Sequence, residues 1–187
     1  MTMPVSMPSA LSARLERAEW LLPTLARFLF AAIFAGYYWI SGLTKLGDGL
    51  IGLFKPSMGA YVQIFPRAME TAGYDANQLS IFHWAVVTAG TWAEFLLPAL
   101  IIAGLLTRLA GLGMIGFVVL QSLTDLYGHG AIGEPGTVGA WFDKAPDAMI
   151  LDQRALWVFL LLVLVIKGAG PLSLDRLLWR RDRMDAL

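Results

Sequence analysis

The 187-residue chain contains no cysteine. This absence excludes disulfides, thiol relays, iron–sulfur clusters and cysteine-ligated zinc. The chain has only two histidines, so imidazole ligands for a metal or a haem are also scarce. Any redox chemistry of this protein must therefore use a bound cofactor or a partner protein.

Charge is scarce as well. Charged residues make up 15 % of the sequence, hydrophobic residues make up 57 %, and the formal net charge is zero. Soluble domains typically carry about 25 % charged residues. The sequence has no basic patch or arm of the kind that binds nucleic acid, so a nucleic-acid partner is not expected.

Long apolar runs are what the chain has in abundance. A membrane-spanning helix needs about 20 predominantly apolar residues. The fourth run has a short apolar core, and its helix-compatible flanks extend it to a full span. We therefore predict an all-α integral membrane four-helix bundle, with spans at about 21–43, 81–106, 109–127 and 149–169.

The spans divide the chain into a transmembrane domain with a tail at each end. The expected parts are an N-terminal tail 1–19, a transmembrane domain 20–170 and a basic tail 171–187. Two long loops, 44–80 and 128–146, connect spans on the outer side. In the first loop, Tyr61, Ile64 and Phe65 have helical spacing, which predicts either an interfacial helix or a helix packed on the bundle. The second loop is rich in glycine and proline and is typical of irregular coil.

Basic residues are distributed unequally between the two sides of the predicted membrane. Cytoplasmic segments of membrane proteins carry an excess of lysine and arginine. The side of the two termini carries more of these residues than the side of the two long loops, so we expect both termini to be cytoplasmic, in a bacterial inner membrane. The side of the termini holds Arg14, Arg17, Arg108, Lys167, Arg176, Arg180, Arg181 and Arg183, and the other side holds Lys45, Lys55, Arg67, Lys144 and Arg154.

Arg14 and Arg17 precede an apolar stretch as in a signal peptide, but Arg27 interrupts it, which favours an uncleaved first helix.

The segment GLGMIG, residues 111–116, matches the glycine pattern of dinucleotide-binding turns. That pattern requires a preceding strand and a helix that begins at the pyrophosphate. These glycines lie inside an apolar span instead. Close packing of helices through small residues is the better interpretation.

Polar residues inside the spans are the candidates for function, because an ionisable group in hydrocarbon costs at least about 3 kcal/mol and normally faces protein or water. At about 100° and 1.5 Å per residue, these polar residues fall on one face of each of three helices. The three faces are Arg27, Phe34, Tyr38 and Lys45; His83, Val87, Gly90 and Glu94; and Gln121, Asp125 and His129.

Depth along the helices suggests how these faces meet. Arg27 and Glu94 differ by only about 6–8 Å along the membrane normal, which is within reach of an arginine side chain. We therefore expect a buried Arg27–Glu94 ion pair, and an outward-facing polar cavity formed by Lys45, His83, Asp125 and His129. Alternatively, all these groups serve only to hold the bundle together.

An ordered set of residues and short motifs lies between residues 21 and 181. They are Arg27, SGLTKL at 41–46 with Gly42 and Lys45, AEFLLPALIIAGLLTRLAGLGM with Glu94, Gly104 and Arg108, and the closing GAGPLSLDRLLWRR. In this set the chain resembles the DoxX family of small four-helix membrane proteins.

The resemblance implies a membrane subunit of a quinone-linked redox system, because the family is similar to the DoxD subunit of thiosulfate:quinone oxidoreductase. A quinone needs lipid access for its tail, hydrogen-bond donors for its carbonyls and acids to relay protons. The electron donor would be a partner protein or a small reductant. The expected catalytic residues are Glu94, Arg27 and Asp125, and the expected cofactor-binding residues are Lys45, His83, Tyr38, Gln121 and His129.

Other functions stay open at this point. Haem would need His83 and His129 as axial ligands, but glycines flank His129 and make a rigid ligand improbable. The case for zinc held by His83, His129 and Asp125 is similarly weak, and no metal is expected. Non-redox alternatives are a scaffold that anchors a partner protein, and a small-molecule or proton carrier in which Glu94 titrates. A homo-oligomer is compatible with any of these.

Overall fold

A computed structural model describes residues 12–13 and 17–178 of the chain. The two predicted tails therefore lie partly outside the described residues. So do Arg14, Arg180, Arg181 and Arg183, on which part of the charge asymmetry depends.

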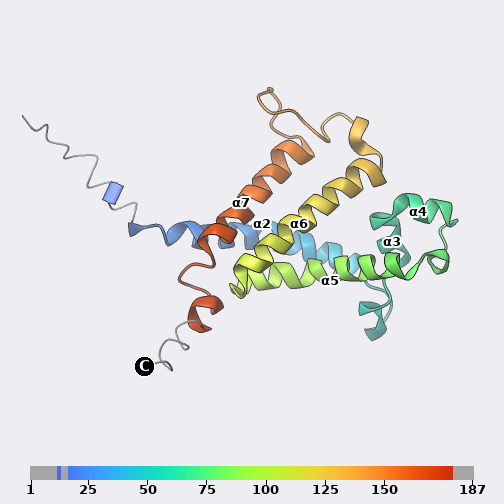
Figure 1. Cartoon of the computed structure of the whole chain (residues 1–187), viewed down its shortest axis with the longest axis horizontal. Helices are drawn as coiled ribbons and strands as arrows, with labels where there is room; N and C mark the ends of the chain where they lie inside the picture. The colour runs from blue at the N-terminus through green and yellow to red at the C-terminus, as the bar shows by residue number, and fades with distance from the viewer. Residues whose placement is uncertain (1–11, 14–16, 179–187) are drawn as a thin grey trace, which may run out of the picture.

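Four long helices make up most of the described chain (Figure 1). The described residues contain no β-strand, which confirms the prediction of an all-α four-helix bundle. The helices agree with the predicted spans to within a few residues. They are α2 (Leu21–Lys45), α5 (Ile81–Ala103), α6 (Thr107–Leu123) with the π-helical extension η3 (Thr124–Gly128), and α7 (Ala155–Lys167) with the preceding π-helical segment η5 (Met149–Arg154).

All four helices are long and apolar enough to cross a membrane, counting η3 with α6 and η5 with α7. The chain is therefore a multi-pass membrane protein. α2 packs on α5 and α7, and α6 packs on the same two helices, so the four close a ring. Large side chains fill the middle of this ring, among them Phe30 and Phe34 of α2, Met114 of α6 and Leu161 of α7.

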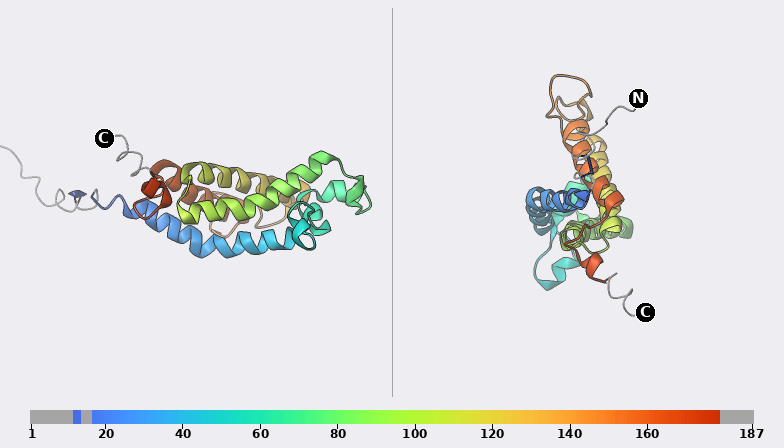
Figure 2. Two further views of the ribbon diagram at one scale, coloured as in Figure 1. Left: turned by 90° about the horizontal axis from the view of Figure 1, so that it is seen from below. Right: turned by 90° about the vertical axis from the view of Figure 1, so that its left-hand side faces the viewer.

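Two short helices, α3 (Met58–Ile64) and α4 (Pro66–Thr71), form most of the structure in the first long loop. They bury Ala60 and Met69 against Val87 near the start of α5. The packed-helix alternative for this loop is therefore confirmed. α5 extends beyond the end of α2 to meet these helices (Figure 2). We call this end of the bundle the loop end, and the opposite end, where α2 begins and α7 finishes, the terminal end.

The remaining elements are short. The second long loop is irregular as predicted, apart from one short helical turn. The short elements are the 3-10 turns η1 (Leu50–Leu53) and η2 (Ala76–Gln78) in the first long loop and η4 (Ala131–Gly133) in the second.

The glycines of GLGMIG lie inside α6, where Gly111 and Gly113 allow neighbouring helices to approach and Gly116 faces open space. A Cβ atom added to Gly111 would lie 3.0 Å from Val165 of α7, and one added to Gly113 would lie 3.0 Å from Leu97 of α5. The packing interpretation of this motif is confirmed. No strand precedes these glycines among the described residues, as a dinucleotide-binding turn would require.

Candidate functional site

Arg27 does not pair with Glu94, so that prediction is wrong. Its guanidinium lies at the terminal end and donates hydrogen bonds to four backbone carbonyls. Two of these belong to Ile101 and Ile102 in the last turn of α5, where carbonyls have no amide one full turn further along the helix; Ile101 also accepts from the Gly104 amide at 3.1 Å. The other two follow α7, at Ala169 (2.9 Å) and Leu172. Positive charge at a helix C-terminus is favourable, so Arg27 acts as a clamp between α2, α5 and the end of α7.

The rest of the terminal end is built around Gly104. Its φ of +68° and its contact with Ser173 leave no room for a side chain. The backbone amide of Asp175 donates to the Gly104 carbonyl at 2.8 Å. The Asp175 carboxylate accepts from the amides of Leu106 (2.7 Å) and Thr107 (3.0 Å), which satisfies the start of α6. The segment PLSLD therefore has a structural role at this end.

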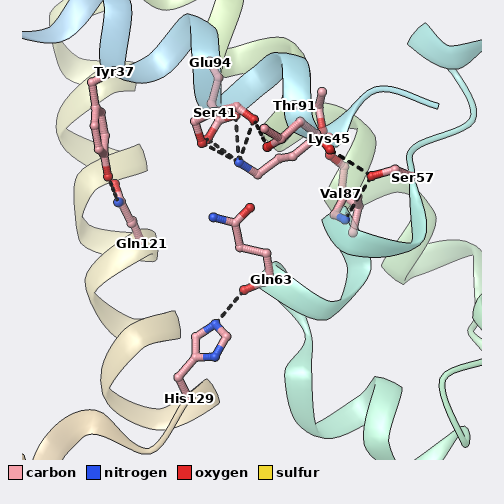
Figure 3. Close-up of polar contacts among 12 residues, drawn as sticks. Tyr37, Ser41, Lys45, Ser57, Gln63, Val87, Thr91, Glu94, Gln121 and His129 are labelled. Atoms are coloured by element: carbon pink, nitrogen blue, oxygen red, sulfur yellow. Dashed lines mark hydrogen bonds and ion pairs between the residues drawn. The ribbon is translucent and has the colours of Figure 1, made fainter. Parts of the chain in front are cut away.

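Glu94 pairs instead with Lys45. The Lys45 Nζ atom lies 2.9 Å and 3.0 Å from the two carboxylate oxygens of Glu94. Both residues are buried, with 3 % and 4 % of their surfaces exposed. Ser41 joins them, because its hydroxyl lies 2.6 Å from Nζ and 3.1 Å from Glu94 Oε1 (Figure 3).

The direction of its side chain sets the depth at which the Lys45 ammonium lies. Side chains of an α-helix point back toward its N-terminus. Lys45 therefore reaches back by one turn to Ser41, instead of extending outward to the membrane surface. This places its ammonium at the depth of Glu94, which lies about 14 Å along the helix axis from the end of α5 at Ala103.

The hydrogen-bonding capacity of Lys45 is exhausted in this pair, whereas that of Glu94 is not. The three N–H bonds of the ammonium are directed at Ser41 and at both oxygens of Glu94. The carboxylate has room for further hydrogen bonds, since each oxygen has two lone pairs. Removing either partner would leave an uncompensated buried charge, which typically costs about 3–5 kcal/mol.

A cavity of about 510 Å³ lies beside this pair. Ser41 and Lys45 line it from α2, Glu94 lines it from α5, and Gln121 lines it from α6, while Asp125 lies at its far end in η3. Ligand-binding pockets commonly have about 300–1,000 Å³, so this one has room for a ring-sized molecule with substituents. Small side chains on the facing sides of α5 and α6 leave the space open, namely Ala89, Gly90, Ala93, Gly113 and Gly116.

The cavity runs from the middle of the bundle toward the loop end. Asp125 lies about 27 Å along the helix axis from the start of α6, whereas Glu94 lies only about half as far from the terminal end. Leu120 lines the cavity and is 64 % exposed, so the cavity opens on the lipid-facing surface between α5 and α6. Gln63 of α3 reaches over it from the loop end (Figure 3).

The side-chain amide of Gln121 has a hydrogen-bond partner in the protein for its nitrogen but none for its oxygen. Its Nε2 atom donates to the Tyr37 hydroxyl at 2.8 Å. Its Oε1 atom is buried and has no hydrogen-bond partner among the described residues. Buried polar atoms are nearly always satisfied in native proteins, so a donor from a bound molecule or a water is expected here.

Asp125 is paired with Arg154 at the start of α7, a contact that sequence reasoning missed. Arg154 Nη2 contacts one oxygen of Asp125, and Nη1 donates to the Ser122 hydroxyl at 3.0 Å. Arg154 is only 5 % exposed. The opposite charges of Asp125 and Arg154, at similar depth on consecutive helices, were the signal that could have found this pair.

Three of the predicted binding residues do not line the cavity. Tyr38 lies in the aromatic core beside Phe117 and is 2 % exposed. His83 accompanies Ser80 at the start of α5, with its Nδ1 atom 2.9 Å from that hydroxyl. His129 lies at the loop end with its Nε2 atom 2.9 Å from the Gln63 carbonyl oxygen (Figure 3).

The structure brings together four of the eight predicted site residues: Lys45, Glu94, Gln121 and Asp125. It adds Ser41 and Gln63. Ser41 lies on the same helical face as Tyr38 and Lys45, so its helical spacing was an available signal. Gln63 gave none, because its position depends on how the first long loop folds back.

Comparison of the chain with protein-family models, with curated proteins and with solved structures finds no match. The features of this chain that bear on its function are therefore the cavity, its polar lining and its access to lipid.

Proposed function

We propose that this protein is a membrane subunit of a quinone-linked redox system and that its cavity binds the hydroquinone form. One observation carries the proposal. A cavity of about 510 Å³ opens toward lipid and ends at the buried Lys45–Glu94 pair. Such a cavity admits a molecule that travels in the bilayer and gives its polar end a charged, hydrogen-bonding wall.

The polar lining favours hydroxyls over carbonyls. A quinone carbonyl can only accept a hydrogen bond, and the donors of Lys45 are already used by Ser41 and Glu94. Near Lys45 the atoms with spare capacity are acceptors, namely the carboxylate of Glu94 and the unpartnered Gln121 Oε1, and Asp125 adds another. The Gln63 side-chain amide, at the loop end of the cavity, offers both a donor and an acceptor (Figure 3). A hydroquinone carries two hydroxyl donors that suit such acceptors.

A quinone–hydroquinone couple, when bound, supplies the transfer of two electrons and two protons. The residues of this chain orient the ring and hold protons. Glu94 accepts a hydrogen bond from one hydroxyl, and Asp125 lies nearer the loop end, where it can pass a proton toward water. Arg27 has no direct part, because its guanidinium is occupied by carbonyls at the terminal end.

The proposed orientation places both termini in the cytoplasm of a bacterial cell. Of the five basic residues expected on the outer side, Lys45 and Arg154 are buried in the bundle and paired with carboxylates. Only Lys55, Arg67 and Lys144 then remain to be counted there. The excess of basic residues on the side of the termini supports this orientation more strongly than the sequence count did.

The resemblance to the DoxX family agrees with this proposal and is itself part of it. The electron donor is then a partner protein or a small reductant that approaches the loop end.

The test is a binding experiment on the full chain in lipid nanodiscs. We expect near-stoichiometric quinone after extraction of the purified protein and mass spectrometry. We also expect a short-chain benzohydroquinone to bind with an affinity that Gly116→Leu lowers at least about tenfold, equivalent to about 1.4 kcal/mol. A Cβ at Gly116 meets nothing within 4 Å, so the leucine extends into the cavity without displacing a neighbour.

Gly36→Leu is the matched control. Gly36 is also helical and has open space around it, but it lies on α2 away from the cavity. We expect this variant to bind like the wild type. Absence of quinone from the wild-type protein, together with equal binding by both variants, would overturn the proposal and favour a protein anchor without a ligand.

A further inference from the structure

A second space lies between α6 and α7, separate from the cavity described above. It has a volume of about 370 Å³ and uses different residues of α6. We call it the α6–α7 groove. Its lining is almost wholly apolar, with Val118, Val119 and Leu123 from α6 and Val158, Phe159 and Leu162 from α7.

One strongly polar side chain interrupts this apolar lining. Arg154 forms part of the wall of the groove and is 5 % exposed. Its two terminal nitrogens are occupied by Ser122 and Asp125. Its Nε atom is buried and has no hydrogen-bond partner among the described residues. A buried donor without a partner costs about 1–3 kcal/mol, so an acceptor from outside the chain is expected.

The surroundings of the groove restrict what that acceptor can belong to. Phe159 is 65 % exposed and Val119 is 49 % exposed, and both lie on membrane-spanning helices, so the groove faces the bilayer. The Arg154 guanidinium lies at the level of Ser122 and Asp125, about 22–27 Å along α6 from Thr107. The hydrocarbon core is about 30 Å thick, so this level is near its edge.

Charge gives a further restriction. The positive charge of Arg154 is already balanced by Asp125. The groove therefore calls for an uncharged acceptor on an apolar chain, and a phosphate or a free carboxylate is less suitable. In a bilayer, the ester carbonyls of lipids provide such an acceptor at the edge of the hydrocarbon core.

We propose that the α6–α7 groove binds one acyl chain of a diacyl lipid, whose ester carbonyl accepts a hydrogen bond from Arg154 Nε. The lipid comes from the leaflet at the loop end. The Nε atom lies below the surface, so side chains of the groove wall must move apart for the carbonyl to reach it. The bound lipid thereby completes the hydrogen bonding of Arg154.

The test compares two lipids that differ only in this carbonyl. The full chain is reconstituted in nanodiscs of phosphatidylcholine that contain a trace of a phosphatidylcholine probe with a photoreactive diazirine on one chain. The probe is used once with ester-linked chains and once with ether-linked chains. We expect labelling of peptides from α6 and α7, about fivefold stronger for the ester probe, as one hydrogen bond of about 1 kcal/mol predicts.

Two variants locate the site without altering Arg154. Ala155→Phe fills the groove from within its lining, and we expect it to reduce labelling by the ester probe to the level of the ether probe. Ala32→Phe adds the same ring to an exposed position of α2 and should leave labelling unchanged. If Ala155→Phe fails to fold, the ester-to-ether ratio of the wild type still decides. Equal labelling by the two probes, or labelling spread evenly over all four helices, would overturn the proposal.

This inference and the proposed function can fail separately. The lipid experiment measures no quinone, and Ala155 does not line the larger cavity. Loss of hydroquinone binding in Gly116→Leu would leave the ester preference unchanged.

Discussion

The two ends of α2 each hold a positive charge, half-buried at Arg27 and fully buried at Lys45, and they do so in different ways. At the terminal end, four backbone carbonyls surround Arg27. Near the other end, Lys45 pairs with Glu94 beside open space. The first arrangement uses the acceptors that a helix end leaves unpaired, so it closes a joint between helices. The second leaves carboxylate lone pairs directed at a cavity.

A charged side chain on a membrane-spanning helix does not by itself identify a functional site. Arg27 and Lys45 are both polar residues within the same membrane-spanning helix, and the sequence treats them alike. What separates them is the space next to each. Gly104 lies directly against Arg27, whereas small residues such as Gly116 leave the cavity near Lys45 empty of side chains.

The largest expected effect comes from breaking the Lys45–Glu94 pair. Glu94→Leu or Lys45→Met leaves one buried charge without its partner, so each should lower the free energy of unfolding by about 3–5 kcal/mol. Thermal unfolding of the purified protein in detergent measures this loss. A loss below about 1 kcal/mol for both variants would contradict the conclusion that Lys45 and Glu94 form a buried ion pair in which each charge compensates the other.

The next effect concerns the clamp at the terminal end. Arg27→Lys replaces the planar guanidinium by an ammonium that cannot reach carbonyls on two separate segments, so we expect a loss of about 2–3 kcal/mol. Hydroquinone affinity should not change, because no cavity residue contacts Arg27. Reduced affinity in a folded Arg27→Lys protein would show that the two ends are coupled.

A smaller effect is expected at Gln121, and it sharpens the account of the cavity lining. Gln121→Met keeps the volume of the side chain but removes the unpartnered acceptor, which should lower hydroquinone affinity about fivefold. Tyr37→Phe removes the other hydrogen bond of Gln121 and leaves the amide in the cavity wall. Calorimetric titration should show the loss in Gln121→Met and little change in Tyr37→Phe.

The smallest effect belongs to the cap of α6. Asp175→Ala removes the acceptor for the amides of Leu106 and Thr107, which should cost about 1 kcal/mol. Asp175→Asn retains an acceptor oxygen and should lose less. Thermal unfolding of the two variants side by side tests this order, and equal losses would assign the effect to charge alone.

Sequence periodicity was sufficient to predict the architecture. Runs of apolar residues determined the number and the approximate bounds of the spans, because a bilayer requires about 20 such residues per helix. Helical spacing also predicted that Lys45, Glu94, Gln121 and Asp125 face the inside of the bundle, where they line the cavity. These inferences need only the geometry of single helices.

The pairing of charges could not be predicted in the same way. Depth along the membrane placed Arg27 within reach of Glu94, but depth does not include the direction of side chains or the unpaired carbonyls at the end of α5. The role of Gln63 depends on a long loop that folds back over the bundle, which helical periodicity does not describe.

The most direct test of the cavity's role uses the double variant Lys45→Met with Glu94→Leu. Replacing a buried ion pair by apolar side chains of similar volume is often neutral or stabilising, so we expect unfolding within about 1 kcal/mol of the wild type. Titration with a short-chain benzohydroquinone should nevertheless show affinity reduced at least about tenfold. A stable double variant that binds the hydroquinone as tightly as the wild type would contradict the account, because the pair would then be architectural in the same sense as Arg27.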